Sequence, residues 1–347
     1  MQRRETGGGR LADNVQHARR WLAGEPTGPL TIEVGPTRGC NHNCVHCGFQ
    51  QYDPYGQRLS LLDCEAFLRF LDDFRALGGQ EVYFAGNGEP LLNPALPEWV
   101  RHGAELGLEM ALSSNGIPLT AARGCQILPF MSWIRFSVNG GTADVYADVH
   151  RCRPADFSRL ERNISAAVRF RNASDLAVRL ALQFIVYELN WGTIAGIVAF
   201  HGRCGTDELV FRGVISRAGA APTLPPAVRQ ALQEAQAAPG VRVRWETFDP
   251  AGPASWSTCR AINLKTNMDD QGNLITCNRN LLKNSIYGNI HARPFREIWL
   301  GSVEKQKLFS EVCTGQDIEH CGKWCQVAYD NALLDALLPA TPAPGVA

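Results

Sequence analysis

Between residues 30 and 214, short apolar segments typical of strands alternate with longer amphipathic segments typical of helices. Repeated strand–helix units predict a parallel sheet covered by helices. About six units in succession favour an α/β fold with a partial (β/α)6 TIM barrel over a complete eight-fold barrel, with the active site at the carboxyl ends of the strands. The expected strands are 30–34, 81–85, 109–113, 133–138, 177–187 and 208–214, and the expected helices are 61–77, 95–106, 119–126, 157–171 and 191–203.

The flanking segments differ from this core in composition. We expect an N-terminal extension at 1–28 with a short helix at 11–22, the barrel at 29–217, and a Pro/Ala-rich linker at 218–245 with one helix near 226–237. Residues 246–338 form a smaller α+β domain, in which Asp269-Asp270-Gln271-Gly272 predicts a hairpin and 294–300 and 303–312 predict helices. Residues 339–347 have the composition of a disordered tail.

The charges balance, with 34 Lys and Arg against 34 Asp and Glu. A neutral chain has no net field to attract nucleic acid or an anionic membrane, so we expect neither as a partner. No apolar run approaches the length of a membrane span, and the early arginines are followed by polar, Gly-rich sequence. We therefore expect a cytoplasmic protein that acts on a small molecule.

Three of the twelve cysteines lie on one short loop directly after the first expected strand, namely Cys40, Cys44 and Cys47. A closed structural metal site needs four protein ligands, whereas three thiolates leave one iron of a [4Fe-4S] cluster open to a small molecule. The spacing therefore predicts a cluster with an open iron at the mouth of the barrel. A zinc knuckle completed by His42 or His46 is the alternative.

The Cys-x3-Cys-x2-Cys loop resembles the signature of the radical S-adenosylmethionine (SAM) superfamily. The resemblance implies that SAM binds the open iron through its amino and carboxylate groups. An electron, supplied by a flavodoxin- or ferredoxin-type donor, then cleaves SAM to a 5'-deoxyadenosyl radical that abstracts hydrogen from the substrate. His46 departs from the family pattern, which has an aromatic residue before the third cysteine.

Further segments at the ends of expected strands resemble the SAM-binding motifs of this superfamily. Ala85-Gly-Asn-Gly-Glu-Pro90 resembles its Gly-Gly-Glu-Pro motif, in which glycines let the backbone approach SAM and a glutamate adds a charge-assisted bond. Arg151 matches an arginine that contacts the SAM carboxylate, although a solvated charge beside a helix is the equal alternative. The residues expected to bind SAM are Gly86, Asn87, Gly88, Glu89, Ser113, Ser114, Asn115, Ser137, Asn139 and Arg151.

A second set of cysteines follows in the last third of the chain. Cys259, then Gly272 after twelve residues and Cys277 after four more, resemble the opening half of a SPASM or Twitch domain. Cys321 and Cys325 resemble its closing pair, while Cys313 competes for one of those positions. Only five cysteines lie here, so one auxiliary [4Fe-4S] cluster is the more economical expectation, and a structural zinc site is the alternative.

A compact core with one auxiliary cluster resembles the branch of the superfamily that modifies sugars and nucleosides in antibiotic biosynthesis. We expect 1,2-diol dehydration of a cytosylglucuronic acid-type substrate, as in blasticidin-type pathways. An alcohol dehydrogenase or an epimerase acting on an aminocyclitol or aminoglycoside is the alternative, and a non-catalytic iron-sulfur electron-transfer protein is the alternative of another class. Hydrogen abstraction from a carbinol carbon needs a base, for which Glu188 is best placed. Arg212 and Arg279 are candidates for binding a substrate carboxylate.

Overall fold

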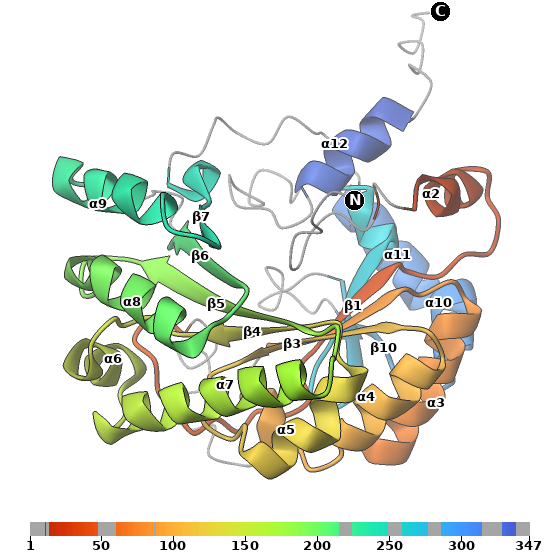
Figure 1. Ribbon diagram of the computed structural model, residues 1–347. Helices are drawn as coiled ribbons and strands as arrows, with labels where there is room; N and C mark the ends of the chain where they lie inside the picture. The colour runs from red at the N-terminus through yellow and green to blue at the C-terminus, as the bar shows by residue number, and fades with distance from the viewer. Residues whose placement is uncertain are drawn as a thin grey trace, which may run out of the picture.

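The computed structural model describes residues 11, 14–47, 60–86, 88–214, 224–248, 259–276, 286–313 and 328–337. Ten strands form one sheet in the order β10-β9-β8-β1-β2-β3-β4-β5-β6-β7 (Figure 1). Strands β8 and β1 to β7 are parallel neighbours, and β9 and β10 continue the sheet in antiparallel pairing. The strands are β1 (Thr31–Val34), β2 (Glu81–Phe84), β3 (Glu109–Ser114), β4 (Trp133–Ser137), β5 (Arg179–Val186), β6 (Glu208–Gly213), β7 (Val241–Val243), β8 (Lys265–Met268), β9 (Asn273–Ile275) and β10 (Ile286–Asn289).

Helices cover the outer face of this curved sheet, as Figure 1 shows for α3, α4, α5, α7 and α8. Polar caps begin several of them: the Asp63 carboxylate accepts a bond from the Ala66 N–H at 2.8 Å at the start of α3. The helices are α2 (Val15–Leu22), α3 (Cys64–Ala76), α4 (Leu96–Glu105), α5 (Ala121–Ile127), α6 (Ala143–His150), α7 (Ala155–Ala173), α8 (Ile194–Cys204), α9 (Pro226–Gln236), α10 (Phe295–Gly301), α11 (Val303–Cys313) and α12 (Ala328–Leu337).

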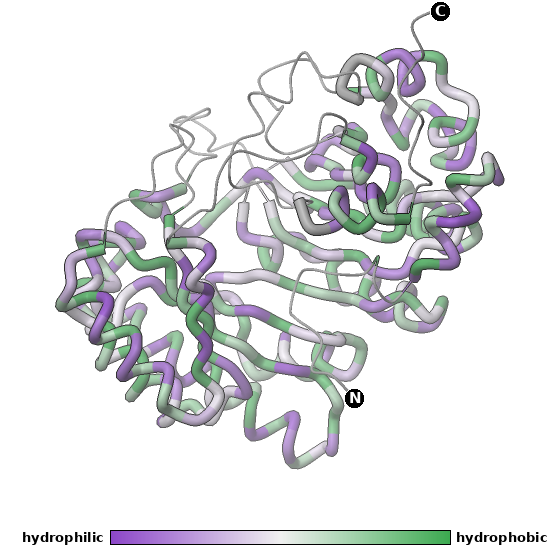
Figure 2. Tube along the Cα trace, turned by 90° about the horizontal axis from the view of Figure 1, so that it is seen from above, coloured by the Kyte–Doolittle hydropathy of each residue, from purple (hydrophilic) through white to green (hydrophobic). Residues whose placement is uncertain are grey.

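The two faces of the sheet differ in chemistry because side chains alternate along each strand. Every second position is apolar and fully buried under the helices, as for Ile32, Phe84 and Phe136. The positions between them are largely polar in the strands that carry the site, for example Tyr83 in β2 and Arg135 in β4. Polar and apolar stretches accordingly alternate along the central strands (Figure 2). The sheet therefore has an apolar outer face and a polar concave face.

The expected α/β class is confirmed, and each strand predicted for the core is present within about two residues of its expected bounds. Four elements were not predicted, namely α6, β7, β10 and α12. Helix α6 has only eight residues, and β7 has only three, which are too few for a clear hydrophobic period. Strand β7 lies in the segment expected to be a linker and pairs in parallel with β6.

The C-terminal segment continues the main sheet. Strand β8 pairs with β1 along all four residues, and the Gly35 N–H donates to the Met268 carbonyl at 2.8 Å. Helix α10 packs its Phe295 ring against Phe70 of α3, with ring centroids 4.8 Å apart. The polar hairpin expected around Asp269 is present as β8 and β9.

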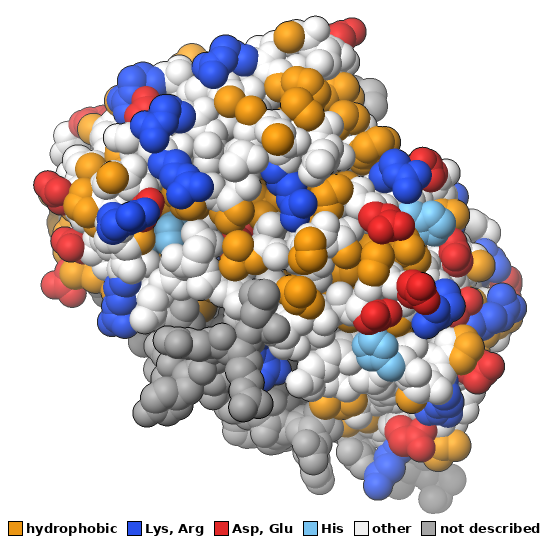
Figure 3. Space-filling model, turned by 90° about the horizontal axis from the view of Figure 1, so that it is seen from below, with side chains coloured by type: hydrophobic (Ala, Val, Ile, Leu, Met, Phe, Trp, Pro, Cys, Tyr) orange, Lys and Arg blue, Asp and Glu red, His pale blue; other side chains and the backbone are white. Residues whose placement is uncertain are grey.

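The outer surface carries basic and acidic side chains interspersed over the helical face (Figure 3). Within the described ranges, no helix combines the length and the apolar character needed to cross a bilayer.

Replacing Phe295 with Ala tests whether this C-terminal helix stabilises the barrel. Phe295 is 1% exposed and lies in an aromatic cluster with Phe70 and Trp299. We expect Phe295→Ala to lower the free energy of unfolding by about 3–5 kcal/mol, measured by chemical denaturation. Leu300→Ala, on the same helix at 36% exposure, is the control and should cost far less. Equal losses would contradict the packing role of Phe295.

Candidate active site

The three-cysteine loop leaves the carboxyl end of β1 and is held against the end of α6. Two backbone bonds fix it there, from the Asn43 N–H to the His150 carbonyl (3.1 Å) and from the Val45 N–H to the Val149 carbonyl (2.9 Å). The Glu89 N–H donates to the Gly39 carbonyl at 2.9 Å and joins the loop to the turn after β2. The cysteines therefore lie where the ends of β1, β2 and β4 meet.

The environment of the three thiols fits an iron-sulfur cluster. Burial raises the pKa of Cys44 well above its ordinary value, and neighbouring Cys40 and Cys47 raise it further. Thiolates this close to one another need a positive centre to offset their repulsion, and clustered iron supplies it. Cys40, Cys44 and Cys47 would hold the cluster, as the sequence predicts.

A single zinc ion at this loop fits less well. The ligand atoms of His42, Cys44 and His150 lie within 4.8 Å of one another, but no such group among the described residues contains Cys40 or Cys47. The three sulfurs therefore do not all lie within 4.8 Å of one another, which suits a cluster that binds each thiolate to a different iron better than a single ion. His46, the other alternative ligand, has both ring nitrogens within hydrogen-bond distance of Asn139 and Tyr187.

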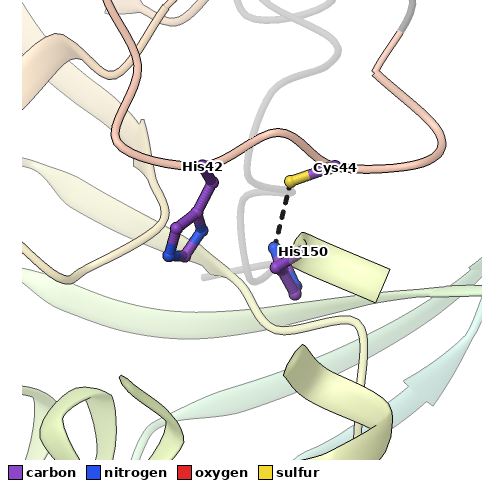
Figure 4. Close-up of side chains that lie close together, drawn as sticks. All are labelled: His42, Cys44 and His150. Atoms are coloured by element: carbon purple, nitrogen blue, oxygen red, sulfur yellow. Dashed lines mark hydrogen bonds between the residues drawn. The ribbon is translucent and has the colours of Figure 1, made fainter. Parts of the chain in front are cut away.

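The tautomer of His150 follows from its hydrogen bonds. The Asn139 backbone N–H, which can only donate, lies 3.1 Å from Nε2, so Nε2 is the acceptor and the ring proton is on Nδ1. Nδ1 lies 3.1 Å from the Cys44 sulfur and therefore donates to it (Figure 4). Burial keeps the pKa of His150 well below its ordinary value, so the ring is neutral. Sequence reasoning did not assign His150 a role.

Glu89 is buried, and its carboxylate forms hydrogen bonds with the turn after β2 and with the end of β3. Its carboxylate accepts bonds from the Asn115 N–H (2.7 Å), the Ser114 hydroxyl (2.8 Å) and the Leu91 N–H (3.1 Å). Burial raises the pKa of Glu89 to about 7, and these three bonds oppose the shift. The carboxylate thus fastens the turn after β2 to the end of β3, which is a structural use that the sequence motif does not specify.

The glycines of the same turn are required by close backbone approach. A Cβ on Gly88 would lie 2.4 Å from the Gly39 carbonyl oxygen and 2.5 Å from that of Thr37. Gly86 has φ +97°, in the region that favours glycine. The cysteine loop therefore packs directly on this turn. Asn87 lies outside the described residues.

The serines and asparagine at the end of β3 divide between two roles. The Ser114 hydroxyl binds Glu89, and the Asn115 amide donates to the Asn41 side chain at 2.8 Å, next to Cys40. Ser113 instead faces the concave side, where its hydroxyl lies 2.6 Å from that of Tyr83. Only Ser113 of the three presents its side chain to the concave face.

The remaining predicted residues lie farther apart. Ser137 is half-buried at the end of β4, opposite Gln183, and Asn139 is fully buried, with its side-chain oxygen accepting from the Ile185 N–H at 2.8 Å. Arg151 is exposed in a left-handed conformation (φ 48°) at the end of α6. Glu188 is exposed in the turn after β5 and forms no hydrogen bond with a described residue.

Two concave-face residues were missed by sequence reasoning. Tyr83 and Arg135 occupy alternate strand positions, and Arg135 donates to the hydroxyls of Ser113 (3.2 Å) and Tyr83. The signal was present, since a polar residue between two apolar ones in a strand points away from the helical layer.

Of the auxiliary cysteines, the structure describes the buried Cys259. The Asn331 side chain in α12 donates to its sulfur at 3.5 Å and accepts from the Ala261 N–H at 2.9 Å. Helix α12 begins three residues after Cys325, so the chain that follows the expected closing pair packs beside Cys259. Cys277, Cys321, Cys325 and Arg279, and the Cys313 side chain, lie outside the described residues.

Comparison with known families agrees with this geometry. Residues 34–178, which include the cysteine loop, Glu89 and His150, match the model of the radical SAM superfamily. This superfamily uses a [4Fe-4S] cluster and SAM, as expected from the motifs.

Individual relatives share parts of the chain. AdoMet-dependent heme synthase of Methanosarcina barkeri is 33% identical over 140 residues, which are 38% of this chain and 37% of the relative. The dTDP-4-amino-4,6-dideoxy-D-glucose ammonia-lyase of Streptomyces venezuelae is 28% identical over 174 residues, which are 48% and 34%. The matches thus span about a third of the length of these curated relatives. SuiB of Streptococcus suis, solved with S-adenosylmethionine, shares the fold with a TM-score of 0.63 at 14% identity, over 89% of this chain and 78% of SuiB.

Replacing Gly88 with Ala tests the packing of the two loops. The added methyl group would collide with two backbone carbonyls, so the cysteine loop must shift. We expect Gly88→Ala to lower the iron bound per chain after anaerobic reconstitution by about half or more, measured by metal analysis. Gly192→Ala, where nothing lies within 4 Å of the new Cβ, is the control. Full iron content in Gly88→Ala would show that the turn does not fix the loop.

Replacing His150 with Leu tests the bond from Nδ1 to the Cys44 sulfur. Hydrogen bonds to cluster sulfurs stabilise the reduced state, so their loss makes the reduction potential more negative. We expect this shift in an electron paramagnetic resonance titration of the reconstituted protein, with iron content retained. Phe157→Leu, which alters another buried ring near Tyr146, is the control. An unchanged potential would contradict the assignment of the donor.

Proposed function

We propose that this chain is a radical SAM enzyme that abstracts hydrogen from a carbinol carbon of a sugar or nucleoside in antibiotic biosynthesis. The observation that carries the proposal is the three-cysteine loop locked between His150 and the Glu89 turn, at the carboxyl ends of the strands of a parallel sheet. When bound, the cluster supplies the electron that cleaves SAM to a 5'-deoxyadenosyl radical. A flavodoxin- or ferredoxin-type protein is the proposed electron donor.

The residues around the loop have separate tasks in this proposal. Glu89 orients the turn after β2, so that backbone carbonyls near Gly86 and Gly88 are available to the SAM ammonium. Asn115 is held against Asn41, beside the first cysteine, and positions the polar end of β3. Cys40, Cys44 and Cys47 hold the cluster. The further SAM contacts proposed are Ser113, Ser114, Ser137, Asn139 and Arg151.

The polar concave face supports a hydroxyl-rich substrate. Tyr83, Ser113, Ser137 and Gln183 carry hydroxyl and amide groups at neighbouring strand positions, which suit hydrogen bonds to sugar hydroxyls. A relative named as an ammonia-lyase of a deoxyamino sugar nucleotide also supports this substrate class. We propose 1,2-diol dehydration of a cytosylglucuronic acid-type substrate, with dehydrogenation or epimerisation of an aminocyclitol as the second candidate.

We also propose one auxiliary [4Fe-4S] cluster, held by Cys259, Cys277, Cys321 and Cys325. Its support is the contact between Asn331 and Cys259, which brings the chain just after Cys325 back to the first of these cysteines. Four thiolates complete the coordination of a cluster, so this one would carry electrons and leave no iron open.

The reaction class is tested by SAM cleavage. After anaerobic reconstitution and with a strong reductant, we expect 5'-deoxyadenosine to form from SAM, detected by mass spectrometry. Cys44→Ala should reduce its formation by a hundredfold or more, because one cluster ligand is lost, while Cys125→Ala on the exposed face of α5 should leave it unchanged. If the wild-type protein forms no 5'-deoxyadenosine, the chain is a non-catalytic iron-sulfur protein instead.

The fate of the substrate radical is tested by product mass with candidate sugar nucleosides and aminocyclitols. Dehydration removes water, dehydrogenation removes two hydrogens, and epimerisation leaves the mass unchanged. Glu188 is the proposed base, and Glu188→Gln should slow product formation by about 10²-fold or more while 5'-deoxyadenosine still forms. Glu161→Gln, on the outer face of α7, is the control. Unchanged turnover in Glu188→Gln would remove Glu188 from the reaction.

A further inference from the structure

At the amino ends of the strands, the charges on the concave face are paired. Lys265 of β8 lies 3.5 Å from the Glu33 carboxylate of β1. The Glu208 carboxylate of β6 lies between two guanidinium groups, 3.1 Å from Arg242 and 3.8 Å from Arg179. Each cation at this level therefore has an anion beside it.

Arg212, four residues after Glu208 on the same face of β6, lacks such an anion. Its side chain forms no hydrogen bond or salt bridge with any residue of the described ranges, and its Nε is buried without a hydrogen-bond partner. A guanidinium group has five donors and keeps its charge in proteins. Burying a guanidinium group without a partner costs free energy, unless a bound anion accepts its hydrogen bonds.

The surroundings of Arg212 are also cationic. The pKa of Arg212 is lowered to about 10, chiefly by burial and then by the positive charges of Arg135 and Arg244, against smaller opposing effects of Tyr83 and Glu246. Arg244 already pairs with Glu246, with 2.8 Å between Nε and Oε1. Arg212 therefore lies among cations, and no anion of the described residues pairs with it.

Arg135 is held in one orientation by its neighbours. Its guanidinium donates to the Ser113 and Tyr83 hydroxyls and lies over the Trp133 ring, 5.5 Å from the centroid. The outer face of the protein, by contrast, mixes both signs of charge (Figure 3). Arg135 thus holds a guanidinium in a fixed position on the same face of the sheet as the unpaired Arg212, and guanidinium groups are the side chains that bind a carboxylate or phosphate through paired hydrogen bonds.

We propose that Arg135 and Arg212 form a subsite on the concave face that binds an oxyanion of the substrate, either a carboxylate or a phosphate group. The subsite rests on the proposed function and deepens it, because it makes the substrate an anionic sugar or nucleoside. Arg212 supplies the unpaired donors, and Arg135 contributes charge in a fixed position. The two sources of the oxyanion are a sugar acid and a sugar nucleotide.

Calorimetric titration of the reconstituted full chain, with SAM present, tests this subsite. The probes are glucuronate for the carboxylate and pyrophosphate for the phosphate group, and we expect at least one to bind. Arg212→Gln should weaken that binding about tenfold or more, and Arg212→Lys, which keeps the charge but loses the planar fork, should weaken it less. Arg203→Gln removes one charge from the outer face, where Arg203 pairs with Glu161, and should bind the probe as the wild type does.

Three results would overturn the proposal: neither probe binds the wild type, Arg212→Gln binds as tightly as the wild type, or Arg212→Gln weakens SAM binding and leaves probe binding unchanged. Circular dichroism of both Arg212 variants confirms that they fold. The formation of 5'-deoxyadenosine without substrate, measured on the same samples, separates this question from the proposed function. If it is absent while the probe binds through Arg212, only the proposed function fails. If it is present while no probe binds, only the subsite fails.

Discussion

The carboxylate of Glu89 is the interaction on which the rest of the site depends. It accepts two backbone N–H bonds and one hydroxyl bond, and its own N–H reaches the carbonyl of Gly39. Through its side chain and its backbone N–H, this one residue fixes the turn after β2, the end of β3 and the start of the cysteine loop. The buried carboxyl group is tolerated there because both of its oxygens accept hydrogen bonds, and its loss would leave several donors unsatisfied.

Prediction from sequence succeeded where one local signal decides the outcome. Alternating apolar strands and amphipathic helices were enough for the α/β class and for β3, and the motifs were enough for the [4Fe-4S] cluster and SAM, which the superfamily uses. That Cys40, Cys44 and Cys47 hold the cluster stays a prediction. The inward bonds of Glu89 and the donor role of His150 could not be predicted, because both depend on which loops meet in space. Short elements such as α6 and β7 were not predicted, because each contains too few residues to show a hydrophobic period.

The residues of the candidate site lie partly inside and partly outside the segment that matches the superfamily. The match to the radical SAM superfamily covers residues 34–178, which hold the cysteines, the Glu89 turn and Arg135. Arg212 on β6 and Tyr187 after β5 lie beyond the matched residues. Arg212 lies on the concave face, and the Tyr187 hydroxyl lies within hydrogen-bond distance of His46. The proposed function assigns radical formation to the matched part. It assigns the choice of substrate to side chains that the rest of the chain adds to the same sheet.

The pairing of β1 with β8 has a consequence for the order in which the chain folds. Strand β1 is synthesised more than two hundred residues before its neighbour β8. At about 5–20 residues per second, one edge of β1 stays without a partner for tens of seconds during translation. The cysteine loop is attached to that strand, so this end of the sheet reaches its final geometry only after the chain through β8 has left the ribosome.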